Sequence, residues 1–196
     1  MGIVSSDRYC AYHSLPPARR QLCWAHLVRN LRGRAEARGP WQAEALAMQR
    51  LAEEVLVVWA MHRDGALTTE VMEGMLRAYQ QALWQHVAAG QRQLNTFGSL
   101  CSDLAPRWDA LWTFLRVEGV EPTNNAAERA LRPAVLWRKG CFGTQSPEGS
   151  RFAERMLTVA ATCQQHDRPL LPFLVAAVAA HWANQPPPAL LPAPTP

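Results

Sequence analysis

The middle of the chain carries the feature that most constrains the fold, a helical spacing of apolar side chains. Residues 41–63 repeat apolar or aromatic side chains with a period of about 3.6 residues, the spacing that gives an α-helix one apolar face. The stripe consists of Ala47, Leu51, Val55, Val58, Trp59 and His62. A helix of this kind must pack against other elements, so the stripe predicts a core built from helices.

Similar patterns, ended by glycine, proline or polar residues, predict helices along most of the chain. The expected spans are 18–38, 41–63, 68–89, 91–104, 106–116, 146–165 and 170–182. A short apolar run over 2–6 predicts a strand, and 137–145 predicts an extended segment broken by glycines. With 48% hydrophobic and 18% charged residues, the chain can build a core, so the expected fold is mostly α with a small β remnant.

The stretch 120–132 is the most informative local motif. Pro122 ends the preceding segment, and Thr123 or Asn124 can cap the helix that follows. Glu128 then lies about one turn into the helix, with Arg132 at i+4 on the same face. An acid beside amides and a guanidinium suits a metal ligand next to phosphate. The alternative is a capped surface helix with an i,i+4 ion pair.

A second acid, Asp7, follows the expected strand at its carboxyl end, a usual place for a catalytic group in α/β folds. Carboxylates from distant segments, such as Asp7 and Glu128, can converge on two divalent metals about 3.5–4 Å apart. Magnesium needs few carboxylates when substrate phosphates supply further ligands. The two acids therefore form one candidate metal pair.

Cysteine and histidine form two C-x-x-H steps, Cys10–His13 and Cys23–His26. The second step is expected inside a helix at i,i+3, either as a functional pair or as a core cysteine beside a hydrogen-bonded histidine. All four residues together could close a tetrahedral zinc site, but their spacing differs from common zinc-finger patterns, which argues against zinc. The odd count of five cysteines predicts reduced thiols in the cytosol.

The chain is mildly basic, with a net charge of +4, and Lys139 is its single lysine. A basic set follows Glu128 directly, and its members are Arg129, Arg132, Arg138 and Lys139. These charges could seat DNA phosphates without reading base sequence, or they could form a solvated helix face. The apolar run at 170–182 is too short to span a bilayer, so no membrane segment is expected.

Taken together, these residues resemble the IS66 family of bacterial insertion-sequence transposases. The resemblance extends from about Ile3 to Val178, and its Asn-Asn-x-x-Glu-Arg block at 124–129 is specific. The matching stretches are 4–12, 21–29, 111–114, 117–132, 137–139, 142–146 and 149–152.

The resemblance implies the C-terminal portion of a ribonuclease-H-like α/β core that a helical insertion interrupts. Residues 1–38 would be a partial core with the second catalytic Asp, and 39–116 the helical insertion. Residues 117–184 would be the C-terminal core with the catalytic Glu helix, and 185–196 a proline-rich disordered tail.

The resemblance also implies a set of site residues. Asp7 would be the second Asp and Glu128 the closing Glu of a D-D-E transposase, both catalytic and both holding Mg²⁺ or Mn²⁺ in a two-metal site. Cys23 and His26 would fill a C-x-x-H step that recurs after the second Asp. The residues expected to contact DNA are Asn124, Asn125, Arg129, Arg132, Arg138 and Lys139. Family members are expected to nick a transposon end and to join the freed 3′-hydroxyl to target DNA.

One departure from the family pattern concerns its first Asp, which lies on a strand before the matched region. The chain is therefore expected to be the C-terminal part of the catalytic domain and inactive alone, with DNA, further copies or the missing half as partners. It would be cytoplasmic and associated with the nucleoid when bound to DNA. The alternatives are a catalytically silent remnant that binds DNA or a transposase, and a small helical module stabilised by zinc.

Overall fold

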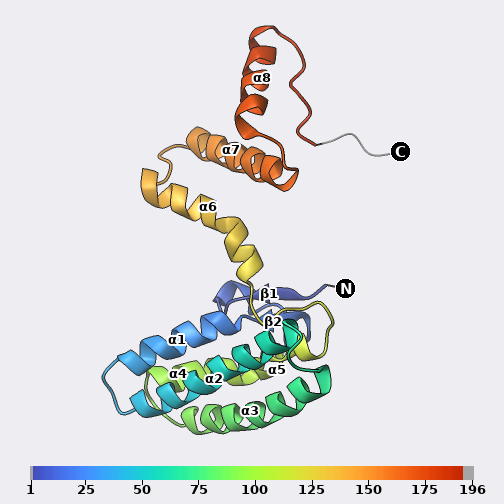
Figure 1. Ribbon diagram of the computed structural model, residues 1–196. Helices are drawn as coiled ribbons and strands as arrows, with labels where there is room; N and C mark the ends of the chain where they lie inside the picture. Colours follow the sequence, from blue (N-terminus) through green and yellow to red (C-terminus); the bar gives the residue numbers. More distant parts are fainter. Residues whose placement is uncertain (1, 192–196) are drawn as a thin grey trace. The chain divides into compact units, whose positions relative to one another are not determined.

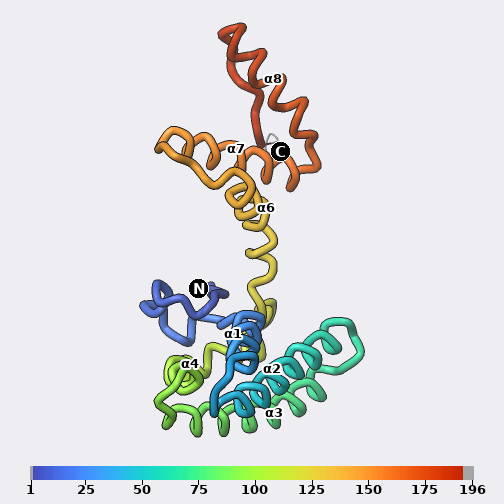
Figure 2. Tube along the Cα trace, turned by 90° about the vertical axis from the view of Figure 1, so that its left-hand side faces the viewer, coloured from blue at the N-terminus to red at the C-terminus, as the bar shows by residue number. Residues whose placement is uncertain are grey.

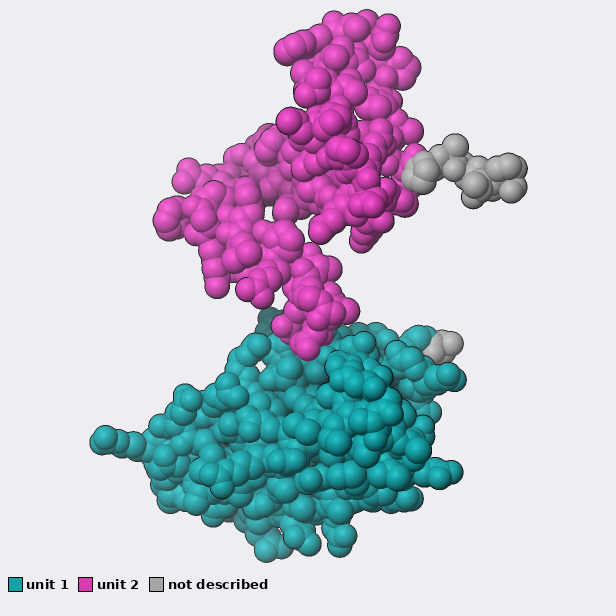
Figure 3. All heavy atoms as spheres, in the orientation of Figure 1, with its two compact units in different colours: residues 1–124 teal, residues 125–196 magenta. Residues whose placement is uncertain are grey.

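In the computed structural model, which describes residues 2–191, the chain divides into two units after Asn124 (Figure 3). Unit 1 comprises 1–124 and unit 2 comprises 125–196. The described elements are mostly helices, and the sheet consists of two short parallel strands. The expectation of a mostly α fold with a small β component is confirmed at this level.

The core of unit 1 is built by four helices, α1 (Trp24–Glu36), α2 (Gln42–Arg63), α3 (Thr69–Gly90) and α4 (Thr96–Leu104). Along the chain each helix packs against the next, and α2 and α3 form a long antiparallel hairpin (Figures 1 and 2). The side chains of α2 that become fully buried are Ala45, Met48, Ala52, Val55 and Val58. The expected stripe is therefore rotated slightly, with Leu51, Trp59 and His62 half-buried along its edge.

Local caps fix several helix starts where the sequence indicates them. The Thr68 side chain accepts a hydrogen bond from the Val71 amide at 3.4 Å, and the Ser146 side chain accepts one from the Gly149 amide at 3.0 Å. These bonds satisfy amides that have no partner within the helix. The expected helices at 41–63 and 68–89 are thus confirmed almost to the residue.

The two strands, β1 (Val4–Ser6) and β2 (Arg20–Leu22), pair in parallel with Val4 opposite Arg20 and Ser6 opposite Leu22. The expectation of a helix from residue 18 is wrong, because α1 begins only at Trp24. The physical reason is tertiary: the buried Gln21 side chain donates to the Leu111 carbonyl at 3.0 Å and accepts from the Phe114 amide at 2.8 Å. These bonds hold the segment extended against a stretch far away in sequence.

Short turns complete unit 1. The 3₁₀ turns are η1 (Cys10–Tyr12), η2 (Pro17–Arg19), η3 (Ala105–Arg107) and η4 (Thr113–Leu115), with α5 (Trp108–Leu111) between the last two. The expected helices at 91–104 and 106–116 are correspondingly wrong in extent: the first begins at Thr96, and the second is broken into these pieces. Trp24 and Trp112 meet edge to face at 4.9 Å between ring centroids, which places this region in the core.

Unit 2 contains α6 (Asn125–Cys141), α7 (Pro147–Gln165) and α8 (Leu170–Trp182). The expected helices at 146–165 and 170–182 are confirmed, whereas the expected extended segment at 137–145 is wrong. There α6 continues to Cys141, and the chain turns only at Phe142 and Gly143, with φ of 59° and 85°. Of the proline-rich tail, 186–191 has no helix or strand, and 192–196 lies outside the described residues.

Among residues 2–191, no helix combines the length and the apolar character needed to cross a membrane.

Candidate functional site

Asp7 directly follows β1 at its carboxyl end and is half-buried. Its Oδ1 accepts a hydrogen bond from the Tyr9 amide at 2.9 Å, a turn in which an Asp side chain binds the backbone two residues on. Its main-chain carbonyl accepts from Ser6 Oγ at 3.0 Å and from Arg20 Nη2 at 3.1 Å. Both the side chain and the main chain of this acid are therefore fixed.

A charged cluster around Asp103 holds the segment after Asp7 against α4. Arg8 Nη1 lies 2.5 Å from Asp103 Oδ2, and Arg107 Nη1 lies 2.8 Å from Asp103 Oδ1. The third cationic group is His13, whose Nε2 lies 3.8 Å from Asp103 Oδ1. Sequence reasoning missed this cluster because Arg8 and Asp103 are separated by 95 positions and neither belongs to a local motif.

Cys23 is the N-cap of α1, so the C-x-x-H step starts at the helix boundary and not inside the helix as expected. Cys23 is buried; its amide donates to the Ser6 carbonyl at 2.9 Å, and its Sγ accepts from the Asn124 amide at 3.4 Å. His26 lies in the first turn of α1 and is half-buried. The structure thus brings Asn124 beside Cys23.

The two C-x-x-H steps do not converge on one site in the part of the chain that the structure describes. Cys10 is exposed in η1, and His13 is directed toward Asp103. The four residues weighed as zinc ligands are therefore not gathered within ligand distance of one another.

The segment that leads to the Asn-Asn-x-x-Glu-Arg block is anchored at the start of α1. The Pro122 carbonyl accepts from the Trp24 amide at 2.9 Å, and Pro122 and Thr123 are buried. This carbonyl satisfies an amide that has no partner within α1. The position of Asn124 is consequently set by the core of unit 1.

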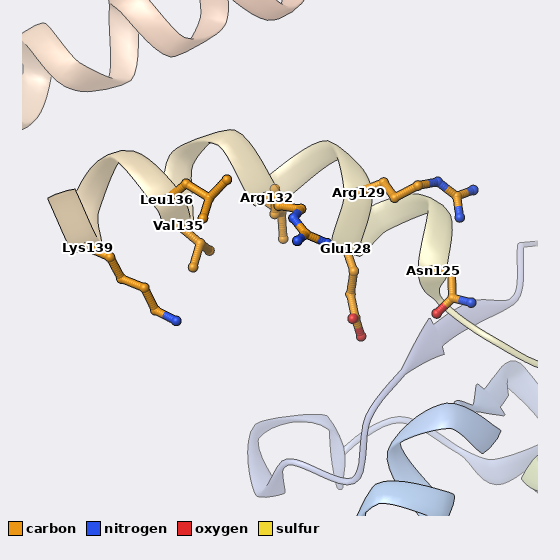
Figure 4. Close-up of a pocket in the computed structure, with 8 residues that line it drawn as sticks. Asn125, Glu128, Arg129, Arg132, Val135, Leu136 and Lys139 are labelled. Atoms are coloured by element: carbon orange, nitrogen blue, oxygen red, sulfur yellow. The ribbon is translucent and has the colours of Figure 1, made fainter.

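In unit 2, Glu128 lies on one face of α6 with Arg132, Val135 and Lys139, which follow it at helical spacing. Figure 4 shows Glu128 and Lys139 pointing to the same side of the helix. The hollow along this helix has a volume of about 560 Å³, and Asn125 and Arg129 also line it. One acid and three basic side chains therefore share a concave surface, which suits a phosphate-bearing ligand.

Arg138 is separated from that basic set. It lines a smaller hollow of about 280 Å³ with residues of α7, including Ser150 and Glu154. The four basic residues that sequence reasoning grouped together are thus divided between two surfaces of unit 2. The reason is that α6 continues as a helix through Trp137–Cys141, which turns Arg138 away from Lys139.

The donor chemistry of the two acids fits a hard divalent cation. Carboxylate oxygens are the ligands that Mg²⁺ prefers, with its remaining positions filled by water or phosphate oxygens. Asp7 uses Oδ1 to accept the Tyr9 amide, and no hydrogen bond to its Oδ2 is recorded among residues 2–191. The Asp7 carboxylate can therefore contribute an oxygen to a metal.

Comparison with known proteins shows which family and which relatives this chain is similar to. The family model described as Transposase IS66 family matches residues 1–152. Uncharacterized protein y4hP of Sinorhizobium fredii (strain NBRC 101917 / NGR234) is 44% identical over 61 residues, 31% of this chain and 11% of that protein. Uncharacterized protein y4qI of the same organism is 26% identical over 183 residues, 84% of this chain and 33% of that protein. The chain spans no more than a third of these relatives, and no solved structure matches it.

Proposed function

This chain belongs to the IS66 transposase family, and from that premise we propose that it carries two of the three acids of a D-D-E transposase. In this proposal Asp7 is the second acid and Glu128 is the closing one. The observation that carries it is the setting of Asp7, an acid at the carboxyl end of a strand that is paired in parallel with β2 and fixed through both side chain and main chain.

We further propose that unit 1 contains part of a ribonuclease-H-like core interrupted by helices. Residues 1–38 and 117–184 would belong to the core, 39–116 would form the insertion, and 185–196 would be a disordered tail. Parallel strands are stable mainly when both faces of their sheet are covered, and a pair of three-residue strands meets this condition best as part of a larger sheet.

Asp7 and Glu128 would hold Mg²⁺ or Mn²⁺, which when bound activates the attacking oxygen and stabilises the leaving one. The other side chains bind and orient DNA. Arg129, Arg132 and Lys139 supply positive charge along the hollow of α6, which Asn125 also lines. Asn124, the last residue of unit 1, would offer a further amide group to DNA. Arg138 would contact DNA from the surface that α6 shares with α7. Cys23 supports the site by fixing Asn124.

The proposed reaction is nicking at the ends of an insertion sequence followed by joining of the freed 3′-hydroxyl to target DNA. The first acid would come from a segment outside these 196 residues, since the resemblance matches it to none of them. The chain alone would then be inactive, and the complete site would form with that segment or in a larger assembly.

The test is a nicking assay on end-labelled inverted-repeat DNA with Mg²⁺ or Mn²⁺. The chain is mixed with a polypeptide that carries the preceding part of a longer family member. We expect nicking that falls by a factor of about 1,000 or more in Asp7→Asn and in Glu128→Gln, because each change removes a charged metal ligand. Glu121→Gln, at an exposed acid in unit 1, is the control. Cleavage that Glu128→Gln leaves unaffected would refute the assignment.

A catalytically silent DNA-binding protein is the second candidate, and the basic hollow of α6 favours it. It predicts DNA binding without nicking in the complemented assay. The two candidates share the binding surface and differ in whether nicking occurs, which in the first candidate requires Asp7 and Glu128.

A further inference from the structure

Arg20 is the first residue of β2 and is only 1% exposed. Among residues 2–191 no carboxylate lies within ion-pair distance of it, although a buried charge is costly unless it is paired or hydrogen-bonded. Its guanidinium lies over the Tyr12 ring, 6.0 Å from the centroid. The side chain is thus held in place by groups other than an acid.

The hydrogen bonds of Arg20 are directed to the main chain at Asp7. Its Nη2 donates to the Asp7 carbonyl at 3.1 Å and to Ser6 Oγ at 3.0 Å. Ser6 Oγ in turn donates to the same Asp7 carbonyl at 3.0 Å. Three groups therefore form a closed triangle, with the Asp7 carbonyl as the shared acceptor.

The triangle lies directly after the last residue pair of the two strands, Ser6 with Leu22. The Cys23 amide bonds to the Ser6 carbonyl, so the Asp7 carbonyl is the first one of this segment beyond the last strand pair. Fixing it fixes the peptide plane between Asp7 and Arg8. The direction of the Asp7 side chain follows, because the Tyr9 amide holds Oδ1 from the other side.

The Arg20 guanidinium forms its hydrogen bonds with the Ser6 hydroxyl and the Asp7 main-chain carbonyl, and none with the Asp7 carboxylate. Burial, and then the charge of Arg107, lower the pKa of Arg20 from its usual value, while the charge of Asp7 raises it. The group stays protonated at neutral pH, because an arginine is not deprotonated in proteins. Both bonds of this group come from Nη2, so one nitrogen of the guanidinium joins the Asp7 carbonyl to the Ser6 hydroxyl.

We propose that Arg20 is a positioning residue for Asp7, fixing the main chain so that the carboxylate is presented to a divalent cation. The proposal rests on the function proposed above only in assigning the cation to Asp7. In this role Arg20 acts through its hydrogen bonds to the Asp7 carbonyl and the Ser6 hydroxyl.

The experiment uses the ¹⁵N-labelled chain of 196 residues with Mn²⁺ as the probe. Arg20→Met removes the guanidinium at similar length, and Arg19→Met makes the same change at an exposed neighbour. The first readout, without metal, is hydrogen exchange of the Tyr9 amide. We expect about fivefold faster exchange in Arg20→Met, as for the loss of one hydrogen bond, and no change in Arg19→Met.

The second readout is paramagnetic broadening of the amides of residues 7–9 by Mn²⁺. We expect Arg20→Met to weaken the apparent Mn²⁺ affinity by about tenfold, the scale for loss of an outer support of a metal ligand. Asp7→Asn should abolish the broadening. Amide resonances of α1 and α2 report whether the fold is kept. If Arg20→Met does not fold, Ser6→Ala tests the same triangle with a smaller change.

The outcomes separate the two claims. Unchanged Tyr9 exchange in a folded Arg20→Met overturns the positioning role, and so does faster exchange with unchanged Mn²⁺ affinity. Absence of broadening in the unmodified chain overturns the claim that this chain presents the Asp7 carboxylate to a divalent cation, whereas the nicking assay with the preceding segment tests the proposed function separately. In that case the exchange measurement alone still decides whether Arg20 fixes the turn at Asp7.

Discussion

Units 1 and 2 are both built from helices that carry apolar side chains, yet they differ sharply in how many of these side chains are buried. In unit 1 the stripes of α1 to α4 enclose one core, in which Leu31, Leu76 and Leu83 have no exposed surface. In unit 2, among the described residues, only Ala153, Cys163 and Phe173 are buried. Large apolar side chains such as Leu131 and Trp182 remain 63% and 82% exposed there.

The difference teaches that helical periodicity specifies a helix and its apolar face but not the partner of that face. Unit 1 supplies its own partners through short connections between successive helices. Unit 2 also carries apolar side chains on its helices, but it derives little stability from burial within itself. The predictions that follow test this contrast.

The strongest perturbation should come from the tightest contact in unit 1. A Cβ at Gly98 would lie 1.9 Å from the Gln93 carbonyl oxygen, a backbone atom that cannot move aside. We expect Gly98→Ala to lower the free energy of unfolding of unit 1 by about 4 kcal/mol, at the upper end for point mutants. Chemical denaturation followed by circular dichroism measures it.

Gly74→Ala is the matched control, because nothing lies within 4 Å of a Cβ there and the residue is inside α3. It should stabilise by about 0.5–1 kcal/mol through helix propensity. Equal midpoints for the two variants would contradict the close packing described for α4.

Truncation of one leucine in each unit tests the contrast directly. Leu76→Ala removes a fully buried side chain and should cost about 3 kcal/mol, including the cavity term. Leu131→Ala removes a side chain that is 63% exposed and should change stability by about 0.5 kcal/mol or less. A comparable loss for both would mean that Leu131 is covered in solution.

The buried thiols offer a kinetic comparison, since Cys101 in unit 1 and Cys163 in unit 2 are 0% and 1% exposed. Alkylation requires local opening, and unit 2 has few buried contacts to resist it. We expect Cys163 to react with iodoacetamide at pH 8 at least about 100-fold faster than Cys101, as measured by peptide mass spectrometry. The exposed Cys10 and Cys141 serve as fast internal references. Equal alkylation rates for Cys101 and Cys163 would contradict the proposed difference in local stability between the two units.

Ionisation of the Cys101 thiol also predicts how the stability of unit 1 depends on pH. Burial raises the pKa of its thiol from 9.0 to about 11. Between these values the unfolded chain has released the proton and the folded chain still holds it. This thiol therefore makes unit 1 less stable as the pH rises from 9 toward 11, and the effect is absent below 9.

The smallest expected effect concerns DNA. Arg132→Glu combined with Lys139→Glu reverses two charges on the hollow of α6 and should weaken binding to duplex DNA by about tenfold or more at low salt. The slope of log affinity against log salt should fall by about 2. Fluorescence anisotropy at several salt concentrations measures both quantities.

Arg77→Glu with Arg92→Glu is the control, because both are exposed arginines of unit 1 and the total charge change is equal. If the two double variants lose affinity equally, DNA binding reflects net charge and not the α6 surface.

Local signals were sufficient for much of the fold. The spans of α2, α3, α7 and α8 follow from signals that act within a few residues, namely the apolar pattern and, for α3 and α7, a side-chain cap. The strand at Arg20–Leu22 could not be found this way, because it depends on partners such as Leu111 and Phe114. At Trp137–Cys141 the glycine suggested a break, but the helix tolerates it.

The candidate site likewise contains some features that could be expected from the sequence and others that could not. The position of Asp7 at a strand end and of Glu128 in the first turn of α6 could be expected from sequence, and their catalytic roles stay predictions. The hydrogen-bonded triangle of Ser6, Asp7 and Arg20 could not be expected from sequence, since nothing in the local sequence marks Arg20 as buried. Buried polar contacts of this kind depend on the assembled fold.

The hydrogen bond between the Trp24 amide and the Pro122 carbonyl also bears on how such a chain can change over time. The chain leaves the strand pair at Trp24, forms the whole helical excursion and returns to the same point. Because closing a longer loop costs little extra free energy, helices in between can be lengthened, shortened or exchanged while both ends stay joined. The excursion can therefore change in length at little cost in loop closure, provided that Leu111 and Phe114 keep their bonds to Gln21 and the helices keep their common core.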